Sequence, residues 1–346
     1  MLDGSYSTWF HQLRDRFVAQ AQPPAPPPAP PPPRLLGLAL GGGGGKGAAH
    51  VGVLQVLEEL DVPIDVIAGT SAGGAVAVMY AAGIDFATMR EVFRTMSLRR
   101  IALPDPTRTG LIGQRRREEI LRALFGTRTF ADLRIPCAVT ATDLVSGKLV
   151  VIREGPLVDA VLATTAVPCI LPPLVRGNEL LADGGILNNL PVDVAQSLGA
   201  QRVVAVELND AVASFSLLSP PATNPLARLM VAPQQLAVAN RALSLLINHA
   251  TALHLQANPP DLLLSPPVVD IPTLDLSNPE KGQQVGMETA RAATDALLAL
   301  RSWRQEPEPP PAPAPAPEPA RPRFSLPFTL PRWGEPATDH GAPPQR

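Results

Sequence analysis

Short apolar runs alternate with longer amphipathic stretches along most of the chain. The runs at 35–40, 135–142 and 203–208 are almost wholly apolar, which is typical of parallel strands buried on both faces of a sheet. Apolar residues recur at helical spacing over 48–60 and 114–125. This alternation predicts an α/β fold, with a mostly parallel central sheet and helices on both faces. The same pattern predicts strands at 64–68, 148–152, 179–182 and 262–264, and helices at 74–82, 86–98, 157–164, 192–198, 226–255 and 286–303.

Proline divides the chain into three parts. Of its 346 residues 42 are proline, concentrated at 23–33 and beyond residue 305. Proline lacks a backbone donor and has a fixed φ, so these segments are predicted to stay outside any packed core. We therefore expect an N-terminal arm at 1–33 that is proline-rich from residue 23, one domain at 34–304, and a proline-rich disordered tail at 305–346.

The charge is close to balanced. The formal net charge is -2, which argues against a nucleic-acid partner. Arg115, Arg116 and Arg117 open a predicted helix and are interpreted as a solvated helix face, with contact to a lipid headgroup as the alternative.

The two cysteines show no metal-binding spacing. Cys137 and Cys169 both lie in apolar segments, so buried thiols are expected, and neither a metal nor a cofactor is predicted. Residues 1–22 contain no apolar leader. The uncharged stretch 66–84 is interpreted as a strand end with a buried helix, so a cytoplasmic protein is expected.

One turn carries the strongest chemical signal. Gly69, Ser71 and Gly73 form a G-x-S-x-G pattern between a predicted strand and a predicted helix. Such a turn exposes a serine hydroxyl, while the flanking glycines let strand and helix approach closely. The N-terminus of the following helix directs free N–H groups towards charge that develops at the serine. The pattern predicts a nucleophilic serine.

A second glycine-rich stretch, GGGGGKG at 41–47, follows the first strand. It lacks the Ser or Thr that a P-loop has after its lysine. Gly42, Gly44 and Gly47 match a dinucleotide-binding spacing, but the next strand ends in the serine turn without the required acid. The remaining interpretation is a nest of amides that holds an oxyanion, with Lys46 adding positive charge.

A serine nucleophile needs a group that accepts its proton. Asp183 follows a short apolar run and precedes Gly184 and Gly185, which places a carboxylate at an uncrowded strand end. His249 and His254, on an apolar helix, are the candidates for a Ser-Asp-His triad, and we interpret both as packed or interfacial. Asp183 is therefore the predicted base.

The three motifs, in this order and context, resemble those of the patatin-like phospholipase family, and the bacterial branch most closely. The resemblance spans 36–197 for the motifs and extends loosely to about 301, and Cys169 stands where relatives frequently have glycine. It implies a patatin-like three-layer sandwich over 34–304, a dyad of Ser71 and Asp183 without histidine, and an oxyanion hole. The motif positions are Gly42, Gly43, Gly44, Gly45, Lys46, Gly47, Gly69, Gly73, Gly184 and Gly185, of which Gly43, Gly44 and Gly45 supply the oxyanion-hole amides.

The resemblance implies a serine acyl hydrolase of phospholipase A or lysophospholipase type, acting through an acyl-enzyme. The expected partner is a phospholipid or other acyl lipid, with peripheral membrane contact. Two alternatives stay open: an esterase with a Ser-Asp-His triad, and a non-catalytic lipid-binding or interaction protein on the same fold. The sequence does not indicate the headgroup, the acyl position or the oligomeric state.

Overall fold

The computed structural model describes residues 33–97, 101, 109–110, 112–208, 234–271, 273, 276 and 278–305. These residues fall within one compact unit. The predicted arm and tail lie outside the described residues, apart from residues 33 and 305 at their edges.

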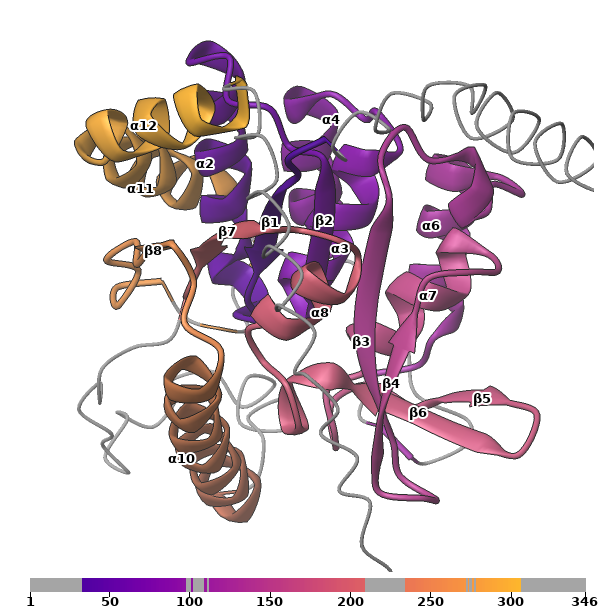
Figure 1. The fold of residues 1–346 in the computed structure, drawn as a ribbon. Coiled ribbons are helices and arrows are strands. Elements are labelled where there is room, and N and C mark those ends of the chain that lie inside the picture. Colours follow the sequence, from indigo (N-terminus) through magenta and orange to yellow (C-terminus); the bar gives the residue numbers. More distant parts are fainter. Residues whose placement is uncertain are drawn as a thin grey trace, which may run out of the picture. The chain divides into compact units, whose positions relative to one another are not determined.

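A sheet of eight strands runs through the described residues (Figure 1). Its order is β5-β6-β3-β2-β1-β7-β8, and β4 pairs with β3 off this path. The neighbouring strands β3, β2, β1, β7 and β8 are parallel to one another. In contrast, β4 and β6 are antiparallel to β3, and β5 is antiparallel to β6. The predicted mostly parallel sheet is confirmed. The strands are β1 (Leu36–Leu40), β2 (Val66–Thr70), β3 (Cys137–Asp143), β4 (Lys148–Ile152), β5 (Leu174–Arg176), β6 (Glu179–Asp183), β7 (Arg202–Val206) and β8 (Leu262–Leu264).

Helices cover both faces of the sheet, as predicted. Alternate residues of each strand face opposite sides. In β1, Leu36, Leu38 and Leu40 belong to the larger core, which the helices α2, α3 and α7 complete, whereas Ala39 packs in a smaller core with α8. The helices are α2 (Ala48–Glu59), α3 (Ser71–Ala81), α4 (Phe86–Thr95), α6 (Arg115–Phe125), α7 (Leu157–Thr164), α8 (Val192–Ser197), α10 (Gln234–Ala257), α11 (Pro279–Ala292) and α12 (Thr294–Gln305), with short 3-10 turns η1 (Gly44–Gly47), η2 (Phe130–Asp132) and η3 (Gly184–Ile186).

Strand β3 brings two distant segments together. Its first half pairs with β2 and places Thr70 opposite Thr140, whereas its second half pairs with β6 and places Asp183 opposite Ala141. Strand β4 pairs with residues from both halves, so β2 and β6 share the other edge of β3. Because β2 is parallel and β6 antiparallel to β3, their carboxyl ends meet at adjacent register positions. Ser71, the residue after β2, therefore lies next to Asp183.

Several elements differ from the prediction. Helix α4 ends at Thr95 rather than 98, and α10 ends at Ala257, while the predicted first part of that helix, 226–233, lies outside the described residues. Helix α3 begins at Ser71 itself, because the strand extends to Thr70. The predicted helix at 286–303 is two helices that part at Ala293, and the first begins earlier, where the Asn278 side chain caps the Lys281 amide. The edge strand β5 follows no clear sequence pattern. No helix in the described part of the chain combines the length and hydropathy that a membrane span requires.

Candidate active site

Ser71 occupies a strained position at the start of α3. Its φ is 52°, in the left-handed region that a residue with a side chain rarely adopts. Gly69 and Gly73 make the turn possible: a Cβ on Gly69 would press into the backbone of Gly73, and one on Gly73 would press into the carbonyls of Leu40 and Gly41. The helix N-terminus then lies directly at the hydroxyl.

Hydrogen bonds hold this turn from both sides. The amide of Ser71 donates to Thr164 Oγ1 at 2.8 Å, at the C-terminal end of α7. Thr70 Oγ1 donates to the Asn188 carbonyl at 2.8 Å and bonds Thr140 Oγ1 at 2.6 Å. All of these groups are buried, so the strained backbone is held by bonds that water does not compete for.

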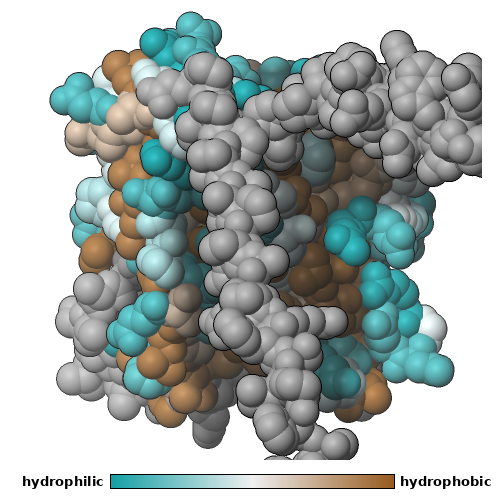
Figure 2. Space-filling view, viewed as in Figure 1, coloured by the Kyte–Doolittle hydropathy of each residue, from teal (hydrophilic) through white to brown (hydrophobic). Residues whose placement is uncertain are grey.

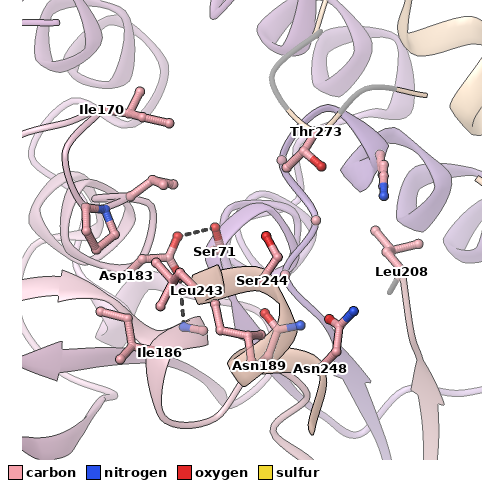
Figure 3. A pocket seen from close by; sticks show the side chains of 18 of the residues that line it. Ser71, Ile170, Asp183, Ile186, Asn189, Leu208, Leu243, Ser244, Asn248 and Thr273 are labelled. Carbon is pink, nitrogen blue, oxygen red and sulfur yellow. Dashed lines mark hydrogen bonds between the residues drawn. The ribbon is translucent and has the colours of Figure 1, made fainter. Parts of the chain in front are cut away.

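Asp183 faces Ser71 across the junction of β2 and β6. Ser71 Oγ donates to Asp183 Oδ2 at 2.5 Å, and the Gly185 amide donates to Oδ1 at 2.8 Å (Figure 3). A side chain on Gly184 would collide with Thr140, so glycine is needed where the chain turns past β3. Both members of the pair are about 6% exposed.

Burial dominates the electrostatics of Asp183. Loss of hydration raises the pKa of its carboxyl to about 6, although the bonds from Ser71 and Gly185 and the charge of Arg117 favour the ionised form. A carboxylate with a pKa near 6 is a stronger base than an exposed aspartate and is still ionised at neutral pH.

The glycine loop lies beside the pair. The Gly42 amide donates to the Asn189 carbonyl at 2.9 Å and the Gly45 amide to the Thr273 carbonyl at 2.7 Å. Gly45 was expected to offer its amide to an oxyanion, but in this structure that amide is engaged. Among the described residues no partner is recorded for the amides of Gly43 and Gly44, which both line the cavity at Ser71.

Three residues that follow the glycines of the loop have different contacts. Lys46 is buried and lines the same cavity. Gly47 leaves room for Ala72 and Phe93 where η1 passes into α2. His50, the third residue of α2, is fully buried and bonds the Gly41 carbonyl through Nε2 at 2.7 Å.

The described histidines stand apart from the pair. Burial lowers the pKa of His50 to about 4, so its ring is neutral and its role is to hold the loop. His249 is exposed and His254 half-buried on α10, and neither lines the cavities at Ser71. Both oxygens of Asp183 are taken by Ser71 and Gly185. Among the described residues, no group of three His, Cys, Asp or Glu side chains is placed to hold a metal.

Two cavities meet at Ser71. The first, of about 210 Å³, runs under α10, and Figure 3 shows Asn189, Ser244 and Asn248 around its polar part. The second, of about 140 Å³, is almost entirely apolar and extends between α3, α6 and α7. Its apolar lining comprises Ala72, Ala75, Phe93, Met96, Ile101, Leu121, Val161, Val167, Ile170, Leu171 and Leu276.

Two interpretations from the sequence are wrong. Arg117 was expected on a solvated helix face, but it is about 4% exposed and lines the apolar cavity, while Arg115 and Arg116 are exposed as expected. Cys137 is buried as expected, whereas Cys169 is exposed, with a φ of 64° that glycine adopts more readily.

Some site residues gave no local signal. Thr164 belongs to an apolar helix and Asn189 to a polar turn, and each acts through a contact with a residue far along the chain. The register of β3 was the missing information, because it decides which loops meet.

Comparisons with known proteins agree with these motifs. The family model for patatin-like phospholipase matches residues 38–195. An uncharacterized NTE family protein of Mycobacterium tuberculosis is 35% identical over 166 residues, 47% of this chain and 46% of the relative. The patatin-like phospholipase domain-containing protein 6 of Mus musculus is 32% identical over 171 residues, 47% of this chain and 13% of the relative.

The chain thus spans about half the length of the mycobacterial relatives and a small part of the mouse protein. Among solved structures, VipD from Legionella pneumophila is 15% identical, with a TM-score of 0.43 over 77% of this chain and 68% of that chain.

Proposed function

We propose that this chain, whose residues 38–195 match the family model for patatin-like phospholipase, cleaves fatty-acyl esters of lipids with a Ser71–Asp183 dyad. The activity is of phospholipase A or lysophospholipase type. One observation carries the proposal: the Ser71 hydroxyl, which lines an apolar cavity, donates to the Asp183 carboxylate at 2.5 Å.

The geometry supports a two-step reaction. Asp183 takes the hydroxyl proton while Ser71 Oγ attacks the ester carbonyl carbon. The amides of Gly43 and Gly44 donate to the oxyanion, and the N-terminus of α3 stabilises its charge. Asp183 returns the proton to the leaving alkoxide, which leaves an acyl-enzyme. Asp183 then takes a proton from water as the water oxygen attacks the acyl carbon. It passes that proton to Ser71 Oγ as the bond between Oγ and the acyl carbon breaks, which releases the fatty acid.

The two cavities suit the two halves of such a substrate. The apolar cavity between α3, α6 and α7 takes the acyl chain. The cavity under α10 takes the polar part, because Lys46, Asn189, Arg241 and Asn248 line it. Ser71 lies in both cavities, where the carbonyl of a lipid ester has to be.

Helix α10 supports contact with a lipid surface. Ser244, Asn248 and other residues of its inner face line the cavity, whereas Leu246 and Leu253 are 67% and 52% exposed on its outer face. Figure 2 shows hydrophobic side chains at the lower left, where Figure 1 places α10. Exposed leucines on a helix that borders the cavity at Ser71 suit contact with a membrane interface. Its 24 residues include neither Asp nor Glu, so no carboxylate repels anionic headgroups.

A lipid panel tests the activity. Wild type, Ser71→Ala and Asp183→Asn are incubated with phospholipids, lysophospholipids and neutral esters, and released fatty acid is measured by mass spectrometry. The proposal predicts release by the wild type and at least a 100-fold loss in both variants. Release of fatty acid by Ser71→Ala at the wild-type rate would contradict the proposed activity.

Substitution on α10 tests the surface contact. Leu246→Asp and Leu253→Asp are expected to slow hydrolysis of vesicle lipid at least tenfold, because burying each leucine contributes about 1.5–3 kcal/mol. Hydrolysis of a soluble short-chain ester should stay within twofold. Val269→Asp, at an exposed valine outside α10, is the control. The contact would be contradicted if Val269→Asp slowed hydrolysis of vesicle lipid as much as the α10 variants do. It would also be contradicted if the wild type sedimented as a dimer and the α10 variants as monomers, because a second copy would then cover the leucines.

A further inference from the structure

The end of α7 is bonded to both members of the dyad. Thr164 Oγ1 accepts the Ser71 amide at 2.8 Å. Two residues later, the Ala166 carbonyl accepts the Asp183 amide at 2.9 Å. The tripeptide 164–166 therefore connects the backbones of two residues that are 112 positions apart. A shift of this segment would change the position of Ser71 relative to Asp183.

The middle residue of the tripeptide is held by a buried arginine. Arg117 Nη2, from α6, donates to Thr165 Oγ1 in a short hydrogen bond. Thr165 Oγ1 in turn donates to the Val161 carbonyl at 2.5 Å, one turn back in α7. Thr165 is thus fixed to its own helix and to the neighbouring helix α6.

Arg117 is a costly residue to keep in this place. It is about 4% exposed, and its Nη1 has no partner among the described residues. Burial lowers the pKa of its guanidinium to about 10, which leaves it charged at neutral pH. A buried cation with so few bonds contributes little to stability, and an apolar residue of similar size is often tolerated better. Its position calls for another explanation, and the charge that it interacts with is Asp183.

We propose that Arg117 is a positioning residue for the Ser71–Asp183 dyad. It holds the end of α7 through Thr165, and its positive charge favours the ionised carboxylate that the reaction needs. This role rests on the proposed function, since it concerns the same pair.

Other charged groups surround the carboxylate. Lys46 of η1 and Arg241 of α10 line the cavity next to Asp183. His50 is neutral, as its low pKa requires. Asp143, the last residue of β3 and two residues beyond the partner of Asp183, accepts bonds from Ser146 and from the Leu180 amide. Lys46 and Arg241 are unchanged in the variants below, so a change in the pH profile reports on Arg117.

Three variants separate the positive charge of Arg117 from its hydrogen bond to Thr165. Arg117→Met removes the charge and the hydrogen bond, and Arg117→Lys keeps the charge. Thr165→Val keeps the arginine but removes the hydroxyl that accepts its hydrogen bond. The exposed Arg122→Met, on the same helix, is the matched control. For each protein, kcat and kcat/KM for a soluble ester are measured between pH 5 and pH 9, together with the melting temperature.

We expect Arg117→Met to lower kcat at least tenfold and to move the acidic limb of kcat/KM upwards by about 0.5–1 pH unit, because the carboxylate loses a nearby cation. Arg117→Lys should keep the limb within about 0.2 unit of wild type, since the charge remains. Thr165→Val should lower kcat and leave the limb in place. Arg122→Met should change nothing.

Two results would overturn the positioning role: an Arg117→Met enzyme with an unmoved limb, whatever its kcat, or an Arg117→Lys enzyme whose limb moves as far as that of Arg117→Met. Ser71→Ala in the same assay separates this proposal from the proposed function on which it rests. If Ser71→Ala is inactive and the acidic limb of Arg117→Met does not move, only the role of Arg117 fails. If Ser71→Ala is active, the dyad fails and the positioning role fails with it.

Discussion

Asp183→Asn should make the protein more stable at pH 8 while it lowers hydrolysis at least 100-fold. Burial raises the pKa of Asp183 from 3.8 to about 6, so the folded state binds this proton more tightly than the unfolded state does. A difference of about two pH units, at about 1.4 kcal/mol each, corresponds to about 3 kcal/mol. Because the folded pKa is raised, the carboxyl favours folding most below pH 4, and this contribution is lost as the pH rises through 6.

Asparagine suits the pocket because it resembles the protonated acid. Its Oδ1 can accept the Gly185 amide and its Nδ2 can donate to Ser71 Oγ, so both bonds seen for Asp183 have a counterpart. The substitution removes the buried negative charge, and the two donors that it leaves unmatched, the second Nδ2 hydrogen and the Ser71 hydroxyl, can bond water in the cavity that Ser71 lines. It also removes the group that accepts the Ser71 proton, so we expect hydrolysis to fall by about 100- to 10,000-fold.

Urea unfolding at pH 5 and pH 8, followed by circular dichroism, measures the effect. The variant should be more stable than wild type by about 3 kcal/mol at pH 8 and by roughly half of that at pH 5, where wild-type Asp183 is mostly protonated in the folded state. A variant that is less stable than wild type at pH 8 would refute the reasoning. So would a gain that is equal at the two pH values, because a buried charge cannot produce it.

Three further predictions concern the same site. The acidic limb of wild-type kcat/KM should lie near pH 6, because protonation of Asp183 removes the base; a limb near pH 4 would contradict this. Gly73→Ala should cost several kcal/mol in the free energy of unfolding, since its Cβ would meet backbone carbonyls, whereas Gly147→Ala, with φ 68° and open space around it, should cost about 1 kcal/mol and keep activity, as denaturation and ester assays would show. Thr164→Val leaves the Ser71 amide without its acceptor and should cost about 1–3 kcal/mol together with much of kcat; a fully active variant would exclude a positioning role for Thr164.

Local chemistry explains why much of the fold could be predicted. The hairpin strand at 148–152 and the helix at 157–164 have the predicted bounds, because their apolar periods are bounded by Gly and Pro. The serine turn was recognisable because a left-handed residue between glycines leaves a short motif. The helix at 286–303 was predicted less well, since its capping residue, Asn278, lies before the apolar period begins.

Contacts between distant segments could not be predicted in this way. Arg117 looked solvated because it lies beside two other arginines, and only the packing of α6 against α7 buries it. The Gly45 amide looked available because nothing nearby in the sequence indicates Thr273, 228 residues later. Three-dimensional context decided both.

The central claim is that Ser71 forms the acyl-enzyme. Treating the protein with a fluorophosphonate and mapping the adduct by peptide mass spectrometry tests it most directly, with ester hydrolysis followed in parallel. The account predicts one adduct per chain on the peptide that contains Ser71, and loss of hydrolysis in proportion to its formation. An adduct on another residue, or full hydrolysis by a chain labelled at Ser71, would contradict it.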